Sequence, residues 1–198
     1  MATAKITKLE AVNRLLDAIG EDAVNSLASG LADAEKAERK IEEVSKEIQA
    51  KGWDCNTSFG LVLSTDSNGK IVLPDNTLKV DTAGTDERLH VGTRGQYLFD
   101  LDNNTLVFDG SVEVDLVQFL DFEDLPYELQ NFIVCRAGRI FQEGAMGSTS
   151  LDGFTSRREK EAEADWNAAA SDTEDANVID QSSSVRVIAY RRSRIFGA

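Results

Sequence analysis

Hydrophobic positions between residues 32 and 53 recur at intervals of three and four. The residues on this stripe are Ala34, Ala37, Ile41, Val44 and Ile48. This spacing places all of them on one side of an α-helix. Gly52 supplies the left-handed residue that ends such a helix, and Trp53 is expected to pack back on Ile48. Because the first two positions are alanines, we expect the helix to lie close against its neighbours.

The same periodicity predicts further helices in the N-terminal and C-terminal thirds of the chain. One runs over residues 8–19, beginning at a capping box of Thr7 and Glu10 and ending at Gly20. Another follows Pro126 and extends to about residue 144. A charged helix is expected over 156–170, opened by a second capping box of Ser156 and Glu159. Residues 171–184 are polar, which predicts a linker.

Between these helices the period changes to short runs typical of β-strands. They lie at residues 59–63, 71–73, 78–80, 89–91, 97–99, 106–108 and 112–116. Clusters of Gly, Asn, Asp and Pro separate them, as in antiparallel hairpins. Six or seven strands in so short a stretch predict a compact antiparallel sheet or a small barrel.

The pattern as a whole predicts an α+β protein. We expect an antiparallel helical bundle with an inserted antiparallel β domain and an extended C-terminal arm. In residue numbers, 1–54 form a helical hairpin, 55–122 the β insertion, 123–172 a helical domain that packs with the hairpin, and 173–198 the arm. An N-terminal signal core and an apolar run long enough to span a membrane are both missing from the sequence, so we expect no membrane association.

Charge is strongly negative and unevenly distributed. The net charge is −14, so binding to nucleic acid through bulk electrostatics is excluded. Residues 95–135 hold nine carboxylates and no Lys or Arg, whereas residues 185–198 hold four arginines and no acid. Two interpretations stay open. Either the acids are a solvated surface and the arginines a loose tail, or the two are complementary patches on different subunits.

The residue types needed for catalysis are scarce. The single histidine, His90, has no nucleophile signature around Ser or Cys to complete a catalytic set. Cys55 and Cys135 lie far apart in sequence and are interpreted as reduced thiols, with no metal-ligand spacing. The stretch from Asp100 to Asn104 fits an Asx-rich turn better than a calcium loop. We therefore expect no enzyme activity, no metal and no cofactor.

Three stretches in order carry a resemblance to a known family. They are residues 11–21 (AVNRLLDAIGE), residues 48–53 (IQAKGW) and residues 95–146, which begin with Gly95, Tyr97, Phe99 and Asp100 and contain the run FIVCRAGRIF. Together they resemble tail tubular protein A, the head-to-tail adaptor (gatekeeper) family of short-tailed (podovirus) bacteriophages. The resemblance covers about residues 9–170.

This resemblance implies a structural virion protein of the tail, assembled in the host cell cytoplasm. It implies a ring of about twelve copies between the capsid portal protein and the tail nozzle protein, with tail fibres as possible further partners. Double-stranded genomic DNA would pass through the ring without specific binding. The alternative is a soluble, non-enzymatic interaction or regulatory module that uses its helical hairpin to bind a partner.

Two sets of residues are candidates for contacts in such an assembly. The first is in the arm, where an alternating run with apolar residues on both sides would be a poor free edge and arginines could bind carboxylates bidentately. These partner-binding candidates are Val185, Arg186, Val187, Tyr190, Arg191, Arg192 and Arg194. The second set comprises Asp100, Asp102 and Asp109, expected to face the DNA channel or a neighbouring subunit.

Overall fold

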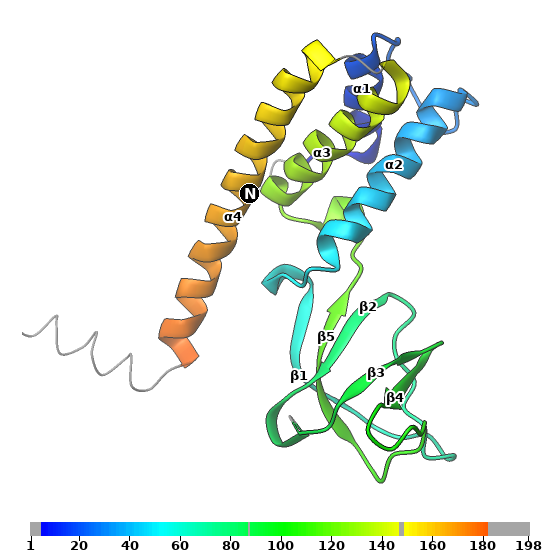
Figure 1. The fold of residues 1–198 in the computed structure, drawn as a ribbon, viewed down its shortest axis with the longest axis vertical. Helices are drawn as coiled ribbons and strands as arrows, with labels where there is room; N and C mark the ends of the chain where they lie inside the picture. The colour runs from blue at the N-terminus through cyan, green and yellow to red at the C-terminus, as the bar shows by residue number, and fades with distance from the viewer. Residues whose placement is uncertain (1–4, 87, 147–148, 182–198) are drawn as a thin grey trace, which may run out of the picture.

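Among the described residues, four helices form one part of the molecule and five strands the other, and α4 extends from the helical part toward the level of the strands (Figure 1). The structure is a computed structural model and describes residues 5–86, 88–146 and 149–181. The helices are α1 (Lys8–Ile19), α2 (Ala32–Gln49), α3 (Tyr127–Met146) and α4 (Thr149–Gln181). The strands are β1 (Thr57–Leu63), β2 (Thr77–Thr82), β3 (Val91–Arg94), β4 (Tyr97–Asp100) and β5 (Val112–Gln118). The fold is α+β, as the sequence predicts.

The helical part is built around α3, which packs against each of the other three helices. All five positions of the predicted α2 stripe are buried in its core, together with Leu15 of α1, Phe132 of α3 and Trp166 of α4. Local signals set the helix ends as predicted. The Thr7 hydroxyl accepts a hydrogen bond from the Glu10 amide at the start of α1, and Gly20 is left-handed at its end.

The end of α2 also follows the prediction. Gly52 adopts φ +81°, a conformation that costs glycine little because it has no Cβ. The chain then turns so that the Trp53 indole Nε1–H donates a hydrogen bond to the Ile48 carbonyl at 3.0 Å. Trp53 thus covers the last turn of the helix.

Helix α4 corrects the prediction for the C-terminal region. Instead of a helix over 156–170 and a polar linker over 171–184, one helix runs from Thr149 to Gln181. Residues 171–181 contain neither Gly nor Pro, so their polarity alone does not stop a helix. Glu159 lies inside this helix, where it binds Arg136 and Arg139 of α3. Residues 182–198, which include every arm residue named above, lie outside the described residues.

The β part has fewer strands than predicted, arranged as two antiparallel sheets. One has the order β1-β5-β2, and the other is the hairpin β3-β4. The runs at 71–73 and 106–108 form single bridges, Val72 with Tyr97 and Lys70 with Val107. Pro74 directly follows the first of these runs and has no N–H to extend a ladder. A second core lies between the sheets, made of Ile71, Leu73, Val80, Leu98, Val112, Val114 and Leu116.

Buried amides join the helical part to the β part. The Gln49 side chain donates to the Leu120 carbonyl at 3.0 Å and accepts from the Leu120 amide at 2.8 Å. The Asn56 side chain donates to the carbonyls of Gln49 and Gln118. Because both amide side chains are buried and bonded, separating the two parts would leave them without partners, which is costly. The junction is therefore firm.

Candidate interaction surfaces

The outer surface of the three-stranded sheet is apolar along its edge strand β1 and negatively charged on β5 and β2. Val80, Val114 and Leu116 point into the core, so the alternate residues of β2 and β5 point outward. On the outer side we define an acidic face, comprising Phe59, Val62, Asp81, Glu113 and Asp115. Phe59 and Val62 are 64% and 60% exposed, which is unusual for large apolar side chains this close together.

Like charges oppose each other on this acidic face. Asp81 of β2 and Asp115 of β5 are direct partners across the antiparallel ladder, an arrangement that is destabilising for two carboxylates. One oxygen of Asp115 accepts a hydrogen bond from the Gly60 amide at 2.8 Å, where β1 is irregular. Lys79 and Lys51 line the shallow hollow of about 220 Å³ beside Phe59. Acids still outnumber bases on the face.

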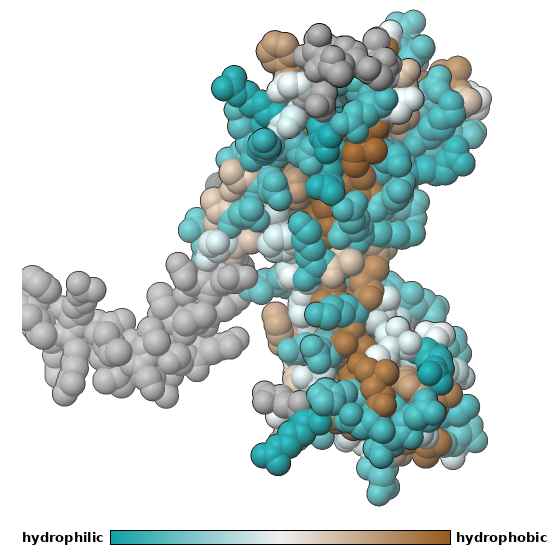
Figure 2. Space-filling view, viewed as in Figure 1, coloured by the Kyte–Doolittle hydropathy of each residue, from teal (hydrophilic) through white to brown (hydrophobic). Residues whose placement is uncertain are grey.

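The outer surface of the hairpin β3-β4 is also apolar, but its charge is positive. Leu98 and Ile71 point into the core, so their neighbours point outward. We define the basic face as Lys70, Val72, Arg94, Tyr97 and Val107. Val72 and Val107 are 49% and 55% exposed. In Figure 2, brown apolar surface interrupts the teal polar surface over the strands.

Aromatic rings hold the two cations of the basic face in place. The Lys70 ammonium lies 5.3 Å from the centre of the Tyr97 ring, and the Arg94 guanidinium lies 3.6 Å from the centre of the Phe99 ring. Such cation–π contacts orient a charge without neutralising it. Asp66 also lies near Lys70. One of its carboxylate oxygens accepts hydrogen bonds from the Asn68 and Lys70 backbone amides, so this carboxylate is held in its own turn.

The three candidate acids have different environments. Asp100 is only 5% exposed, and its oxygens accept hydrogen bonds from the Asp102 and Asn103 amides and from the Asn103 side chain. The Asn103 side chain is the main cause that lowers the Asp100 pKa. This is the Asx-rich turn that the sequence predicts. The Asp100 carboxylate is committed to that turn and does not face outward.

Asp102 and Asp109 are exposed. One Asp102 oxygen lies 3.0 Å from Nδ1 of His90. This hydrogen bond raises the pKa of His90 and lowers the pKa of Asp102. Asp109 lies in a separate turn that precedes β5. The candidate acids that remain available to a partner are therefore Asp102 and Asp109.

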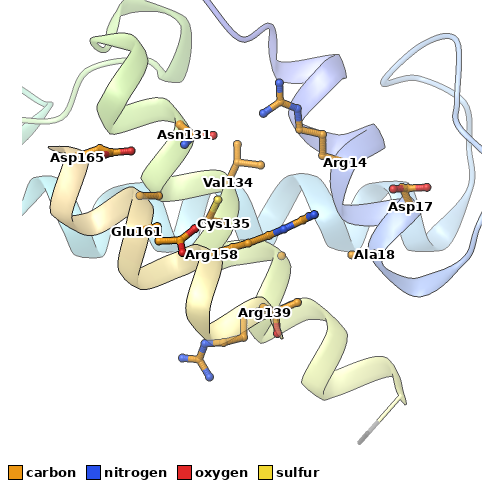
Figure 3. Close-up of a pocket in the computed structure, with 13 residues that line it drawn as sticks. Arg14, Asp17, Ala18, Asn131, Val134, Cys135, Arg139, Arg158, Glu161 and Asp165 are labelled. Atoms are coloured by element: carbon orange, nitrogen blue, oxygen red, sulfur yellow. The ribbon is translucent and has the colours of Figure 1, made fainter. Parts of the chain in front are cut away.

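A groove of about 490 Å³ lies between α1, α3 and α4 (Figure 3). Its lining mixes signs, with Arg14 and Asp17 from α1 and Arg158 and Asp165 from α4. Cys135 of α3 lies in it, and burial raises the pKa of its thiol. A thiol that stays protonated is a poor nucleophile. The groove therefore offers ion-pairing groups rather than a reactive centre.

The described residues offer neither a metal cluster nor a membrane-spanning helix. They contain no group of three or more His, Cys, Asp or Glu placed to hold a metal ion. No helix among them combines the length and apolarity needed to cross a membrane. The two faces described above are not apparent in the sequence, because assigning Lys70, Arg94 and Phe59 to a face requires the strand register.

Comparisons with known proteins identify the family. The family model described as Tail tubular protein (Tube) matches residues 9–176. Tail tubular protein A of Klebsiella phage KP34 is 33% identical over 119 residues, which cover 60% of this chain and 62% of that relative. The chain thus matches less than two thirds of the relative's length. Because the family model spans most of the chain, including both the helical and the β parts, the chain belongs to the tail tubular protein family, which forms structural parts of phage tails.

Proposed function

We propose that this protein is the head-to-tail adaptor of a short-tailed phage. In this role about twelve copies form a ring between the capsid portal and the tail nozzle, and genomic DNA passes through its centre. The observation that carries the proposal is the family match over residues 9–176, which includes every helix and strand of the molecule except the first residue of α1 and the end of α4. The ring is assembled in the host cell and stays in the virion tail.

The division of the molecule into two parts suits an adaptor. Each part has its own apolar core, so each presents a surface that does not depend on the other. The buried amides of Gln49 and Asn56 fix the two parts to one another. A rigid connector of this kind can bind the portal through one end and the nozzle through the other.

The charge of the chain suits a passage for DNA. A net charge of −14 per copy repels phosphates, whereas a basic channel would bind DNA by releasing counterions. DNA bound in that way would move slowly. The proposal therefore includes no specific DNA contact, and the exposed acids Asp102 and Asp109 are its candidate channel residues.

The C-terminal arm is the proposed contact with the portal or an adjacent subunit. Figure 1 shows α4 running from the helical part toward the level of the strands, so residues 182–198 follow from the end of a long helix. The arginines of the arm, Arg186, Arg191, Arg192 and Arg194, would bind carboxylates of the partner. Val185, Val187 and Tyr190 would supply its apolar contacts.

The alternative function, an interaction module that uses its helical hairpin, has less support. That function needs a free apolar stripe on α2 to receive a partner helix. Ile41 and Val44 of this stripe are buried within the chain's own core, where α3 packs against α2. A partner helix could bind the stripe only by displacing α3.

Co-purification with the portal protein tests the proposed function. Full-length chain, mixed with portal, should form a complex whose mass corresponds to a ring of about twelve copies. Deleting residues 185–198 should abolish the complex while the circular dichroism spectrum and the unfolding midpoint stay unchanged. The adaptor role would be contradicted if the full-length protein remained a monomer or dimer and did not bind the portal protein. A truncated protein that still joins the portal would contradict only the role of the arm.

A further inference from the structure

The acidic face and the basic face point in opposite directions. Each is the outer side of one sheet, and the inner sides of both sheets share one core. Val80 and Leu116 enter this core from the three-stranded sheet, and Ile71 and Leu98 enter it from the hairpin side. The outward residues therefore lie on the two opposite sides of the β part.

The two faces are alike in apolar content and opposite in charge. Phe59 and Val62 are the exposed apolar residues of one face, and Val72 and Val107 are those of the other. The β1 strand also forms one edge of its sheet in the described structure. The backbone N–H and C=O groups along that edge are therefore open to a partner. Exposed apolar groups surrounded by polar ones are typical of protein–protein interfaces.

We propose that the acidic face of one copy binds the basic face of the next copy. This inference rests on the proposed ring, and it assigns the surfaces that join neighbouring subunits in it. Phe59 and Val62 of one copy pack against Val72 and Val107 of the next. Arg94 and Lys70 of the second copy reach the carboxylates of the first.

The charges on the acidic face favour this occupant. Asp81 and Asp115 repel each other across the ladder in the single chain, and a cation from a neighbour would convert that repulsion into attraction. Arg94 suits the task because its stacking on Phe99 already limits its conformations, so less entropy is lost on binding.

The pairing of unlike faces also determines the type of assembly. A twofold dimer through either face would place acid against acid or base against base. Contact between two different faces is heterologous, and repeating it produces a closed ring or an open filament. A ring around DNA requires this type of contact.

Charge-reversal variants D81K and R94E test the proposal. Each alone should weaken self-association of the full chain at least about tenfold, since like charges would then meet across the interface. A mixture of D81K and R94E should assemble again, because the lysine introduced in one variant then meets the glutamate introduced in the other, and the remaining contacts keep their native charges. Association is measured by sedimentation and native mass spectrometry. E21K and K160E, at exposed positions of the helical part, are the controls with equal charge changes.

Folding defects are separated from lost contacts by the thermal midpoint. D81K removes the repulsion with Asp115, so it should raise the unfolding midpoint of the dissociated chain while it weakens association. A folding defect would instead lower both the unfolding midpoint and the strength of association. K70E is a second variant of the basic face that leaves the Arg94–Phe99 stack in place, and it should also weaken association and be rescued by D81K.

Several results would overturn the assignment of the faces. The assignment is wrong if D81K alone and R94E alone form rings as readily as the wild type. It is also wrong if the two variants are folded but fail to assemble when mixed. If D81K and deletion of residues 182–198 both weaken assembly while R94E and K70E do not, the arm occupies the acidic face instead. These results leave the ring role intact. Wild-type protein that forms no ring, alone or with portal, would remove the proposed function and the inference together.

Discussion

Trp166 of α4 packs edge to face on Trp53, with ring centres 5.1 Å apart and planes at 75°. Trp53 lies just beyond Gly52, in the turn that follows α2, so this contact joins α4 to the region where the helical part meets the β part. The N–H groups of the two indoles differ in their hydrogen bonding. Trp53 Nε1–H donates to the Ile48 carbonyl, whereas the buried Nε1 of Trp166 has no hydrogen-bond partner among the described residues.

Replacing Trp166 therefore separates packing from hydrogen bonding. W166A should lower the free energy of unfolding by about 3–5 kcal/mol, as expected for deleting a large buried aromatic side chain. W166F should cost less than W166A, because the ring contact survives and an unpaired buried N–H is removed. Urea unfolding followed by circular dichroism gives both values. Equal losses in the two variants would show that the indole nitrogen has a partner.

The buried stripe of α2 gives a second stability prediction. Ile41 and Val44 lie in the helical core, so I41D or V44D should cost about 3–5 kcal/mol by placing an unpaired charge among apolar side chains. The matched control is R39D on the exposed side of the same helix, which should change stability by less than about 1 kcal/mol. If the I41D variant unfolded like the wild type, Ile41 would not be buried, and the stripe would have been assigned to the wrong side of the helix.

The helices were predictable because their signals are local. The stripe of α2, the capping hydroxyl of Thr7 and the left-handed glycine at position 52 each act within one or two turns of chain. The length of α4 was not, because residues 171–181 are polar but contain neither Gly nor Pro, so polarity alone did not show that the helix continues through them. Glu159 looked like a capping residue for Ser156, but Arg136 and Arg139 of α3 bind it instead.

The faces of the β part were not predictable because they depend on register. Sequence showed where the short apolar runs lie but not how they pair. Only the pairing of Val72 with Tyr97 and of Arg94 with Tyr97 places these residues on one surface. Likewise the sequence grouped Asp100 with Asp102, although one carboxylate turns inward to its own loop and the other points to His90.

The His90–Asp102 pair should titrate as a unit. Asp102 raises the pKa of His90 in the folded chain, so the stabilisation from protonated His90 is fully present below its unfolded pKa and is lost as pH rises through the folded pKa. The Asp102 pKa is lowered, so its contribution is present above its unfolded pKa and is lost as pH falls through the folded pKa. The stabilisation from the pair is therefore complete between the unfolded pKa of Asp102 and the unfolded pKa of His90, and it declines on either side of that range.

Replacing Asp102 tests this coupling directly. D102N should return the His90 pKa toward its ordinary value, because the hydrogen bond to a charged carboxylate is the main cause of the rise. His90 is the only histidine, so NMR of its ring protons reports the pKa without assignment. D109N is the control, with the same change in charge. A His90 pKa that is the same in D102N and wild type would show that the ion pair does not form in solution.

The exposed acids provide a test of DNA passage in the assembled particle. If Asp102 and Asp109 line the channel, D102K and D109K together should slow DNA ejection from virions, because the new cations bind phosphates. The delay should be greatest at low salt and shrink as salt rises, since counterions compete for the same phosphates. Asp100 is left unchanged because its carboxylate holds its own turn, and E21K with D22K in the helical part supplies an equal change of charge. An ejection rate at low salt that matches the control would place both acids on the outside of the ring.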